Sequence, residues 1–73
     1  MAKGKSSILV NFAKKVRLRR HELGLTQEQL AERADFHVNY VGGIERAERN
    51  ASIESIVILA KALEISPKDL MPD

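Results

Sequence analysis

The side chains best suited to chemistry in this chain are amides and a guanidinium on two short, neighbouring segments. Gln27 stands at the start of the first segment, where the free N–H groups of a helix N-terminus would favour a phosphate. Asn39 lies in the first turn of the second segment, and its amide can pair with adenine through N7 and N6. Arg46 ends that segment with a planar fork that fits guanine. These residue types point to contacts with a nucleic acid.

Each of these residues also has an ordinary structural interpretation. Gln27 is a residue type that favours helix on an exposed face, and Asn39 could complete local capping. Arg46, Arg49 and Asn50 form a cluster that could be a solvated charged loop. We favour a phosphate contact for Gln27 and a base or phosphate contact for Asn39. For the cluster we favour contacts with the phosphates of the DNA backbone.

The outer side of the second segment adds three further candidates. Val38 offers a methyl surface to thymine or is half-buried against Phe36, and Tyr40 either reaches DNA or covers the helix as a partly buried aromatic. Gly43 faces outward and lacks a side chain, so the backbone could approach the groove floor and recognise DNA shape. The alternative for Gly43 is a loose, strained helix. The alternatives stay open at Val38 and Tyr40, whereas at Gly43 we favour the close approach.

Helical periodicity predicts the elements that position these residues. Apolar residues recur at helical spacing from Ile8 to Leu23, with Ser7 as the N-cap and Gly24 as the left-handed residue after the end. Thr26-x-x-Gln29 is a capping box that starts a second helix. Its buried stripe is expected to consist of Leu30, Ala31 and Ala34.

A turn over residues 35–37 leads into a third helix, expected from about Val38 to Arg46. Ser52 caps a fourth, strongly apolar helix, and Ser66-Pro67-x-Asp69 opens a short fifth. The predicted fold is all-α, with five helices in a single helix-turn-helix domain over residues 7–73. A flexible basic arm is expected over residues 1–6.

Two stretches stand out as a sequence pattern: Gly24-Leu25-Thr26-Gln27-Glu28-Gln29-Leu30-Ala31 and Ile44-Glu45-Arg46. They resemble the phage repressor and Cro-type helix-turn-helix family. A longer pattern, Tyr40-Val41-x-x-Ile44-Glu45-Arg46-x-x-Arg49-Asn50, is similar to the controller proteins of restriction–modification systems. The resemblance implies a five-helix domain that binds operator DNA as a two-fold dimer through its fourth and fifth helices. The chain departs from it at Val38, where controllers commonly carry a polar residue, and at Arg19, generally aliphatic in the family.

Glu45 falls on the inner face of the third helix, where an unpaired carboxylate would be costly. The resemblance implies that Arg20 is its partner and that this structural ion pair locks the third helix against the first. The alternative is a surface pair with Arg49 one helical turn away, which would contribute only ~0.3–0.5 kcal/mol. We favour Arg20.

The fourth and fifth helices carry more apolar side chains than one small domain can cover. The surplus predicts a self-complementary dimer contact, and the alternative is a broadly packed helix. The residues expected in this interface are Ile58, Ile65, Leu70 and Met71.

Composition narrows the class of protein. Of the 12 Lys and Arg residues, seven lie in residues 1–20, which contain no acid, while five bases face ten acids in the remainder. A basic N-terminal region favours electrostatic contact with the phosphates of a nucleic acid. The absence of cysteine excludes thiol nucleophiles and thiolate metal sites. No apolar run approaches the ~18 residues of a membrane span, so we expect a cytoplasmic protein.

The expected function is therefore sequence-specific regulation of transcription by a homodimer on double-stranded DNA. No cofactor, metal, small-molecule ligand or membrane contact is expected, and no catalytic set is evident. The alternative is a protein-interaction module on the same fold, such as an antitoxin or anti-regulator. The double glycine and Val38 make that alternative credible.

Overall fold

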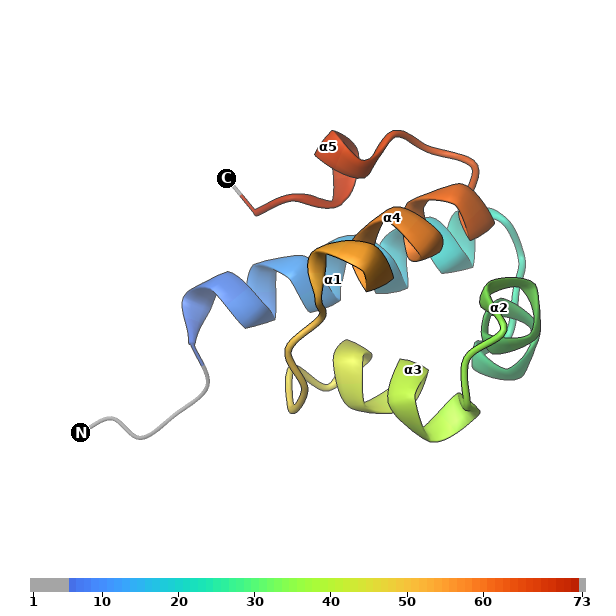
Figure 1. The fold of residues 1–73 in the computed structure, drawn as a ribbon, viewed down its shortest axis with the longest axis horizontal. Helices are drawn as coiled ribbons and strands as arrows, with labels where there is room; N and C mark the ends of the chain where they lie inside the picture. Colours follow the sequence, from blue (N-terminus) through green and yellow to red (C-terminus); the bar gives the residue numbers. More distant parts are fainter. Residues whose placement is uncertain (1–5, 73) are drawn as a thin grey trace.

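The computed structural model describes residues 6–72, so the predicted arm lies outside the described residues except for Ser6. The described chain consists of helices and connecting loops, with no strand among these residues, which confirms the predicted all-α fold (Figure 1). The helices are α1 (Ser7–Glu22), α2 (Gln27–Ala34), α3 (Val38–Glu45), α4 (Ile53–Ala62) and α5 (Pro67–Leu70). None of them is both long and apolar enough to cross a bilayer.

The helix ends follow from local side-chain hydrogen bonds. Thr26 and Gln29 form the predicted capping box of α2, with both hydrogen bonds present at 3.0 and 2.8 Å. Ser52 caps α4 as predicted. The prediction for α1 was one residue late, because Ser6 is the N-cap and its hydroxyl accepts from the Leu9 N–H at 3.0 Å. Ser7 is instead the first helical residue.

Left-handed residues turn the chain between helices. Gly24 has φ +70° after α1, as predicted, and Asp35 has φ 58° at the end of α2. The Phe36 side chain after it packs against the core, so the turn between α2 and α3 is anchored on its inner side. α3 ends at Glu45 with Arg46 as its C-cap, which agrees with the predicted end at about Arg46.

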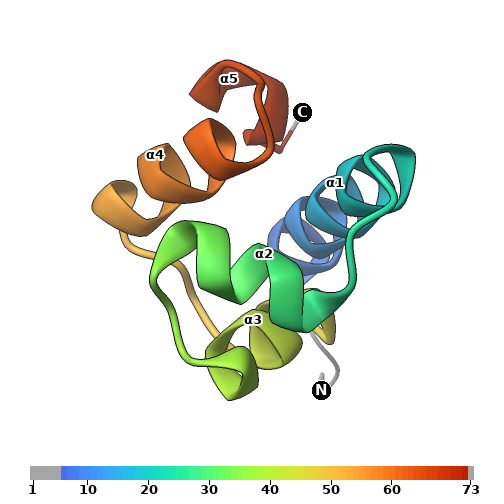
Figure 2. The same cartoon turned by 90° about the vertical axis from the view of Figure 1, so that its right-hand side faces the viewer.

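The core lies where the inner faces of all five helices meet. Its fully buried large side chains are Val16, Leu30, Val41, Ile44, Leu59, Leu63 and Leu70. Ala31 and Ala34 are buried on α2, as predicted, and their small size allows α3 to cross closely. Figures 1 and 2 both show α3 along the bottom of the molecule, beneath the other helices. The outer side of α3 is therefore a face of the fold.

Candidate nucleic-acid interface

The inner side of α3 is fixed to α1 by a buried, two-pronged ion pair. Glu45 is only 4% exposed, and Arg20 donates to both of its carboxylate oxygens, from Nε at 2.7 Å and Nη2 at 2.8 Å. The third donor is Gln27, whose Nε2 lies 3.1 Å from Glu45 Oε1. The structure thus has the Arg20 pair rather than the alternative with Arg49. Paired and hydrogen-bonded charges of this kind hold an element in one orientation.

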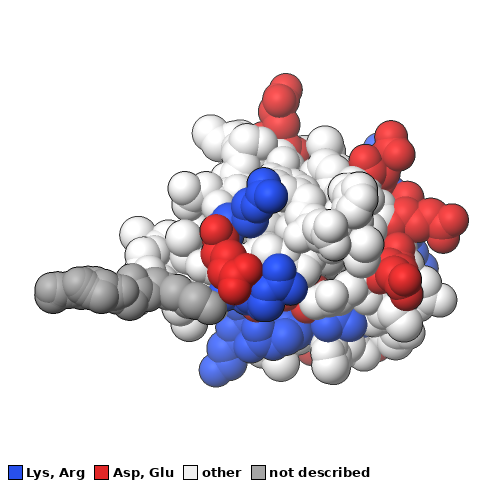
Figure 3. All heavy atoms as spheres, turned by 90° about the horizontal axis from the view of Figure 1, so that it is seen from below, with Lys and Arg blue, Asp and Glu red and all other residues white. Residues whose placement is uncertain are grey.

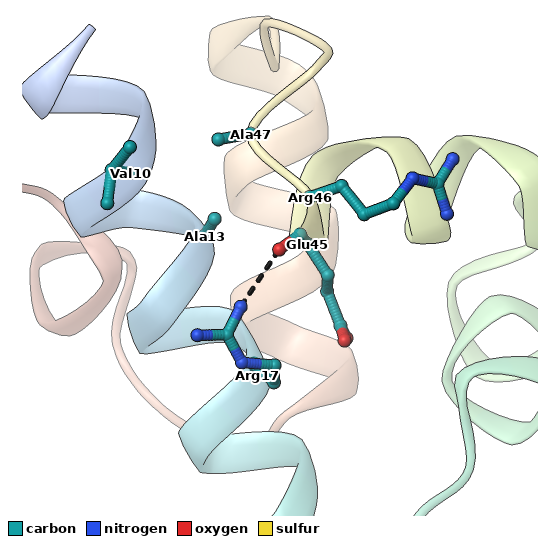
Figure 4. Close-up of a pocket in the computed structure, with 6 residues that line it drawn as sticks. All are labelled: Val10, Ala13, Arg17, Glu45, Arg46 and Ala47. Atoms are coloured by element: carbon teal, nitrogen blue, oxygen red, sulfur yellow. Dashed lines mark hydrogen bonds between the residues drawn. The ribbon is translucent and has the colours of Figure 1, made fainter. Parts of the chain in front are cut away.

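The end of α3 is held by a second arginine of α1. Arg17 Nη1 donates to the backbone carbonyl of Glu45 at 2.9 Å (Figure 4). The two residues belong to a shallow groove between α1 and the end of α3, lined also by Val10, Ala13, Arg46 and Ala47. Sequence reasoning missed this role of Arg17, because only the fold brings α1 beside the last turn of α3.

The outer side of α3 and the following loop present the polar candidates. Asn39, Arg46, Arg49 and Asn50 are all exposed, while Gln27 is half-buried at the edge of this face. The N-cap of α3 is His37, whose Nδ1 accepts from the Asn39 backbone N–H at 3.0 Å. Viewed from the side of α3, basic side chains extend from the middle of the surface to its lower edge, with one acidic group among them and the other acidic groups towards the right and the top (Figure 3).

Val38 and Tyr40, for which both interpretations were left open, have structural contacts. Val38 is half-buried and packs against the core, in line with its structural alternative. Tyr40 is half-buried too, with its ring edge-to-face with Phe36 at 5.1 Å between centroids and its hydroxyl donating to Ser55 Oγ at 3.0 Å. Tyr40 thereby ties α3 to α4.

Neighbouring side chains cover both glycines of α3. Gly43 was expected to face outward with its backbone open, but both Gly42 and Gly43 are buried. A Cβ atom on Gly42 would lie 2.9 Å from Arg46 Nη1, and one on Gly43 would lie 2.7 Å from Arg49 Cγ. The backbone of Gly43 is therefore not open as expected, because the stem of Arg49 from the following loop covers this position.

The predicted dimer residues do not form one surface. Leu70 is 0% exposed and belongs to the core, so its place in an interface is excluded, and Ile65 is half-buried against the same core. Ile58 and Met71 are exposed. Ile53, which is 81% exposed, and Val57, which is 48% exposed, also lie at the surface but were not in the set of expected interface residues. Their spacing of four residues, one helical turn apart, was the available signal.

Arg19, where the resemblance implied an aliphatic residue, has a structural role in this fold. Its Nε donates to the carbonyl of Leu63 at 2.9 Å, and Arg33 Nη1 donates to the carbonyl of Ala62 at 3.2 Å. The last carbonyls of α4 are thus satisfied by arginines from α1 and α2. An aliphatic residue at position 19 could not make this contact.

Comparison with known proteins agrees with this geometry. The family model described as helix-turn-helix matches residues 14–70. The chain belongs to the helix-turn-helix family. Among its relatives is control protein C.SmaI of Serratia marcescens, 46% identical over 60 residues, covering 82% of this chain and 71% of the relative.

Two solved structures place this helix-turn-helix chain among controller proteins. The restriction–modification controller C.AhdI from Aeromonas hydrophila superimposes with a TM-score of 0.88 and 42% identity, over 90% of this chain and 100% of that one. The controller C.Esp1396I, solved as a tetramer with its natural 35-base-pair operator, gives a TM-score of 0.84 and 35% identity, over 90% and 87% of the two chains. The resemblance inferred from the sequence is confirmed.

Proposed function

We propose that this helix-turn-helix chain is a sequence-specific transcription regulator, which binds a pseudo-palindromic operator as a homodimer and controls a restriction–modification operon. The main observation behind the proposal is that α3 is fixed on its inner side and exposed on its outer side. The ion pair of Arg20 and Glu45 fixes its inner side, while Asn39, Arg46 and Arg49 are exposed on its outer side and the loop after it. A rigidly held helix with a polar and basic outer face fits the major groove of DNA.

The related controllers support the DNA-binding and regulatory parts of this proposal. C.SmaI is named a control protein, and C.Esp1396I forms a complex with its operator. We propose a binding rather than a catalytic role, exercised in the cytoplasm by one domain over residues 7–73 preceded by a basic arm. Half-sites would lie about one helical turn of DNA apart, roughly 34 Å.

A dimer is supported by the exposed apolar side of α4. Ile53, Val57 and Ile58 lie exposed on this helix, and with Glu54 they line a shallow hollow in the surface. Clustered apolar side chains of this kind mark protein contacts. The two-fold symmetry of a dimer would match the symmetry of a palindromic operator.

The proposal is tested by fluorescence anisotropy with a duplex from the region upstream of the gene and with a scrambled duplex. Titrations at about 50 and 200 mM salt should show specific binding that weakens steeply with salt, because cationic side chains displace counterions from phosphates. Absence of both specific binding and a salt slope would favour the protein-interaction module instead.

Asn39→Ala separates base contacts from phosphate contacts. We expect this variant to relax the sequence preference at one operator position, whereas Gln27→Ala and Arg46→Ala should weaken binding to all sequences. Preference is measured by competition with single-base operator variants. Lys61→Ala, an exposed charge on α4, is the matched control and should leave both affinity and preference unchanged. An unaltered preference profile in Asn39→Ala would refute its assignment as a base contact.

A further inference from the structure

The two adjacent glycines of α3 are the least expected feature of this helix. Gly42 and Gly43 stand in the middle of an eight-residue helix, where each costs roughly 1 kcal/mol relative to alanine. Both are buried, although they lie towards the side of α3 that carries the polar candidates. Arginine side chains from the next loop lie against both positions, and Gln27 of α2 also lies near Gly42, with its Oε1 3.5 Å from where a Cβ atom would stand.

Arg49 lies directly on the backbone of Gly43. A Cβ atom at position 43 would stand 2.7 Å from Arg49 Cγ and 3.7 Å from both its Cβ and its Cδ. The clash is with the stem of the side chain, close to its own backbone, so a small rotation of the guanidinium would not relieve it. Arg46 differs, since only its terminal Nη1 and Cζ approach the equivalent position on Gly42, at 2.9 and 3.8 Å.

The far end of Arg49 is positioned by Tyr40. The guanidinium carbon of Arg49 lies 6.0 Å from the centre of the Tyr40 ring, within the range of a cation–π interaction. That ring cannot move freely, because it packs edge-to-face on Phe36 and its hydroxyl donates to Ser55 Oγ. Two residues of α3 about one turn apart thus position Arg49: its aliphatic part lies on Gly43 and its guanidinium lies near the ring of Tyr40.

We infer that Gly43 is a positioning residue, whose missing side chain seats Arg49 across the outer side of α3 so that Arg49 contacts a guanine of the operator. This inference rests on the proposed function and deepens it. Arg49 occupies the space of a side chain at position 43, which on a bound duplex would face the groove floor. A guanidinium there can donate to guanine O6 and N7 together.

A double-variant cycle of Gly43→Ala and Arg49→Ala tests whether Gly43 positions Arg49. Each single variant should weaken operator binding about tenfold, because one bidentate base contact is lost or misaligned. Gly43→Ala should have no further effect in the Arg49→Ala background. An equal additional loss in that background would overturn the inference, since it would mean that the Gly43 backbone itself approaches DNA. Unchanged affinity of Gly43→Ala would overturn it as well.

Base preference tests the other half of the inference. With single-base operator variants, the wild type should discriminate for guanine at one position, and both single variants should lose this discrimination. A uniform loss across all sequences would overturn the base contact in favour of a phosphate contact. Arg49→Lys leaves the residue at position 43 unaltered and keeps the charge, and it should retain the salt slope but lose the guanine preference. Retained preference in Arg49→Lys would also overturn the inference.

The wild-type titration separates this inference from the proposed function. If the wild type shows no operator binding, the proposed function fails. If the wild type binds and the cycle shows no coupling between positions 43 and 49, only the inference that Gly43 positions Arg49 is refuted. Circular dichroism of each variant confirms that the helical fold is present before affinities are compared.

Discussion

Ala47 adopts a backbone conformation that residues with a side chain avoid. Its φ of 60° is left-handed, at the point where the chain leaves α3 for the loop. Ala47 is only 7% exposed and lines the groove beside Arg17. The left-handed conformation costs a non-glycine residue roughly 1–2 kcal/mol, and burial of one methyl group returns at most about 0.8 kcal/mol. The rest of the domain has to offset the difference.

Ala47→Gly should therefore stabilise the protein by roughly 0.5 kcal/mol. Urea denaturation followed by circular dichroism measures this free energy of unfolding. Ala60→Gly, a buried position inside α4, is the matched control and should destabilise the protein by at least about 1 kcal/mol. A loss of stability in Ala47→Gly would show that the buried methyl group outweighs the backbone strain.

Single-residue predictions from the sequence worked where the cause is local. Gly24 was correctly placed in the left-handed region, because it directly follows a periodic helical segment. Ala47 gave no such signal, since alanine is a residue type typical of helix interiors. The covering of Gly43 was equally unpredictable, because it depends on the path of a side chain six residues later.

At the scale of elements, the link between α1 and α3 decides how the outer face is presented. Arg20 and Glu45 are 25 residues apart in the chain and share two hydrogen bonds. Burial makes the pair sensitive to the removal of one partner, because the remaining carboxylate would be desolvated without compensation.

Arg20→Ala should destabilise the fold by about 3–5 kcal/mol, close to the whole stability of a small domain. Thermal and urea unfolding measure the loss. The double variant Arg20→Met with Glu45→Met should recover much of it, because no buried charge is left. Glu22→Ala removes the exposed pair with Arg19 and should cost under about 0.5 kcal/mol. If the double variant is no more stable than Arg20→Ala, the cost comes from a cause other than the stranded carboxylate.

Element boundaries were predictable because capping signals are short. The boxes at Thr26 and Ser66 and the cap at Ser52 all lie within three residues of their partners. The contact of Arg17 with the end of α3 spans 28 residues and the contact of Arg19 with the end of α4 spans 44. Contacts of that range require the packed fold, so the sequence alone could not reveal them.

For the whole molecule, the apolar side of α4 carries the prediction of a dimer. A surplus of apolar residues near the C-terminal end was correctly seen in the sequence, but its members were partly misassigned. Leu70 fills the core beneath α5, whereas Ile53 and Val57 remain at the surface. Counting apolar residues shows that a surplus exists, and only packing shows which of them are left outside.

Val57→Glu should convert the protein to a monomer in sedimentation velocity, because two like charges would meet across a two-fold contact. Operator affinity should fall in parallel, since each subunit would then bind its half-site alone. Leu18→Glu, at a similarly exposed position on α1, is the control and should leave the dimer intact. Persistence of the dimer in Val57→Glu would place the subunit contact elsewhere.

The arginines that hold carbonyl groups change how the basicity of this molecule should be counted. Arg17, Arg19, Arg20 and Arg33 each donate to a carbonyl at or near the end of a helix. Three of these guanidinium groups also pair with a carboxylate, Arg19 with Glu22, Arg20 with Glu45 and Arg33 with Glu64, and the paired acid offsets part of their attraction for a polyanion. Replacing the four arginines with lysine would leave the isoelectric point nearly unchanged yet loosen four joints of the scaffold, because an ammonium group lacks the planar fork.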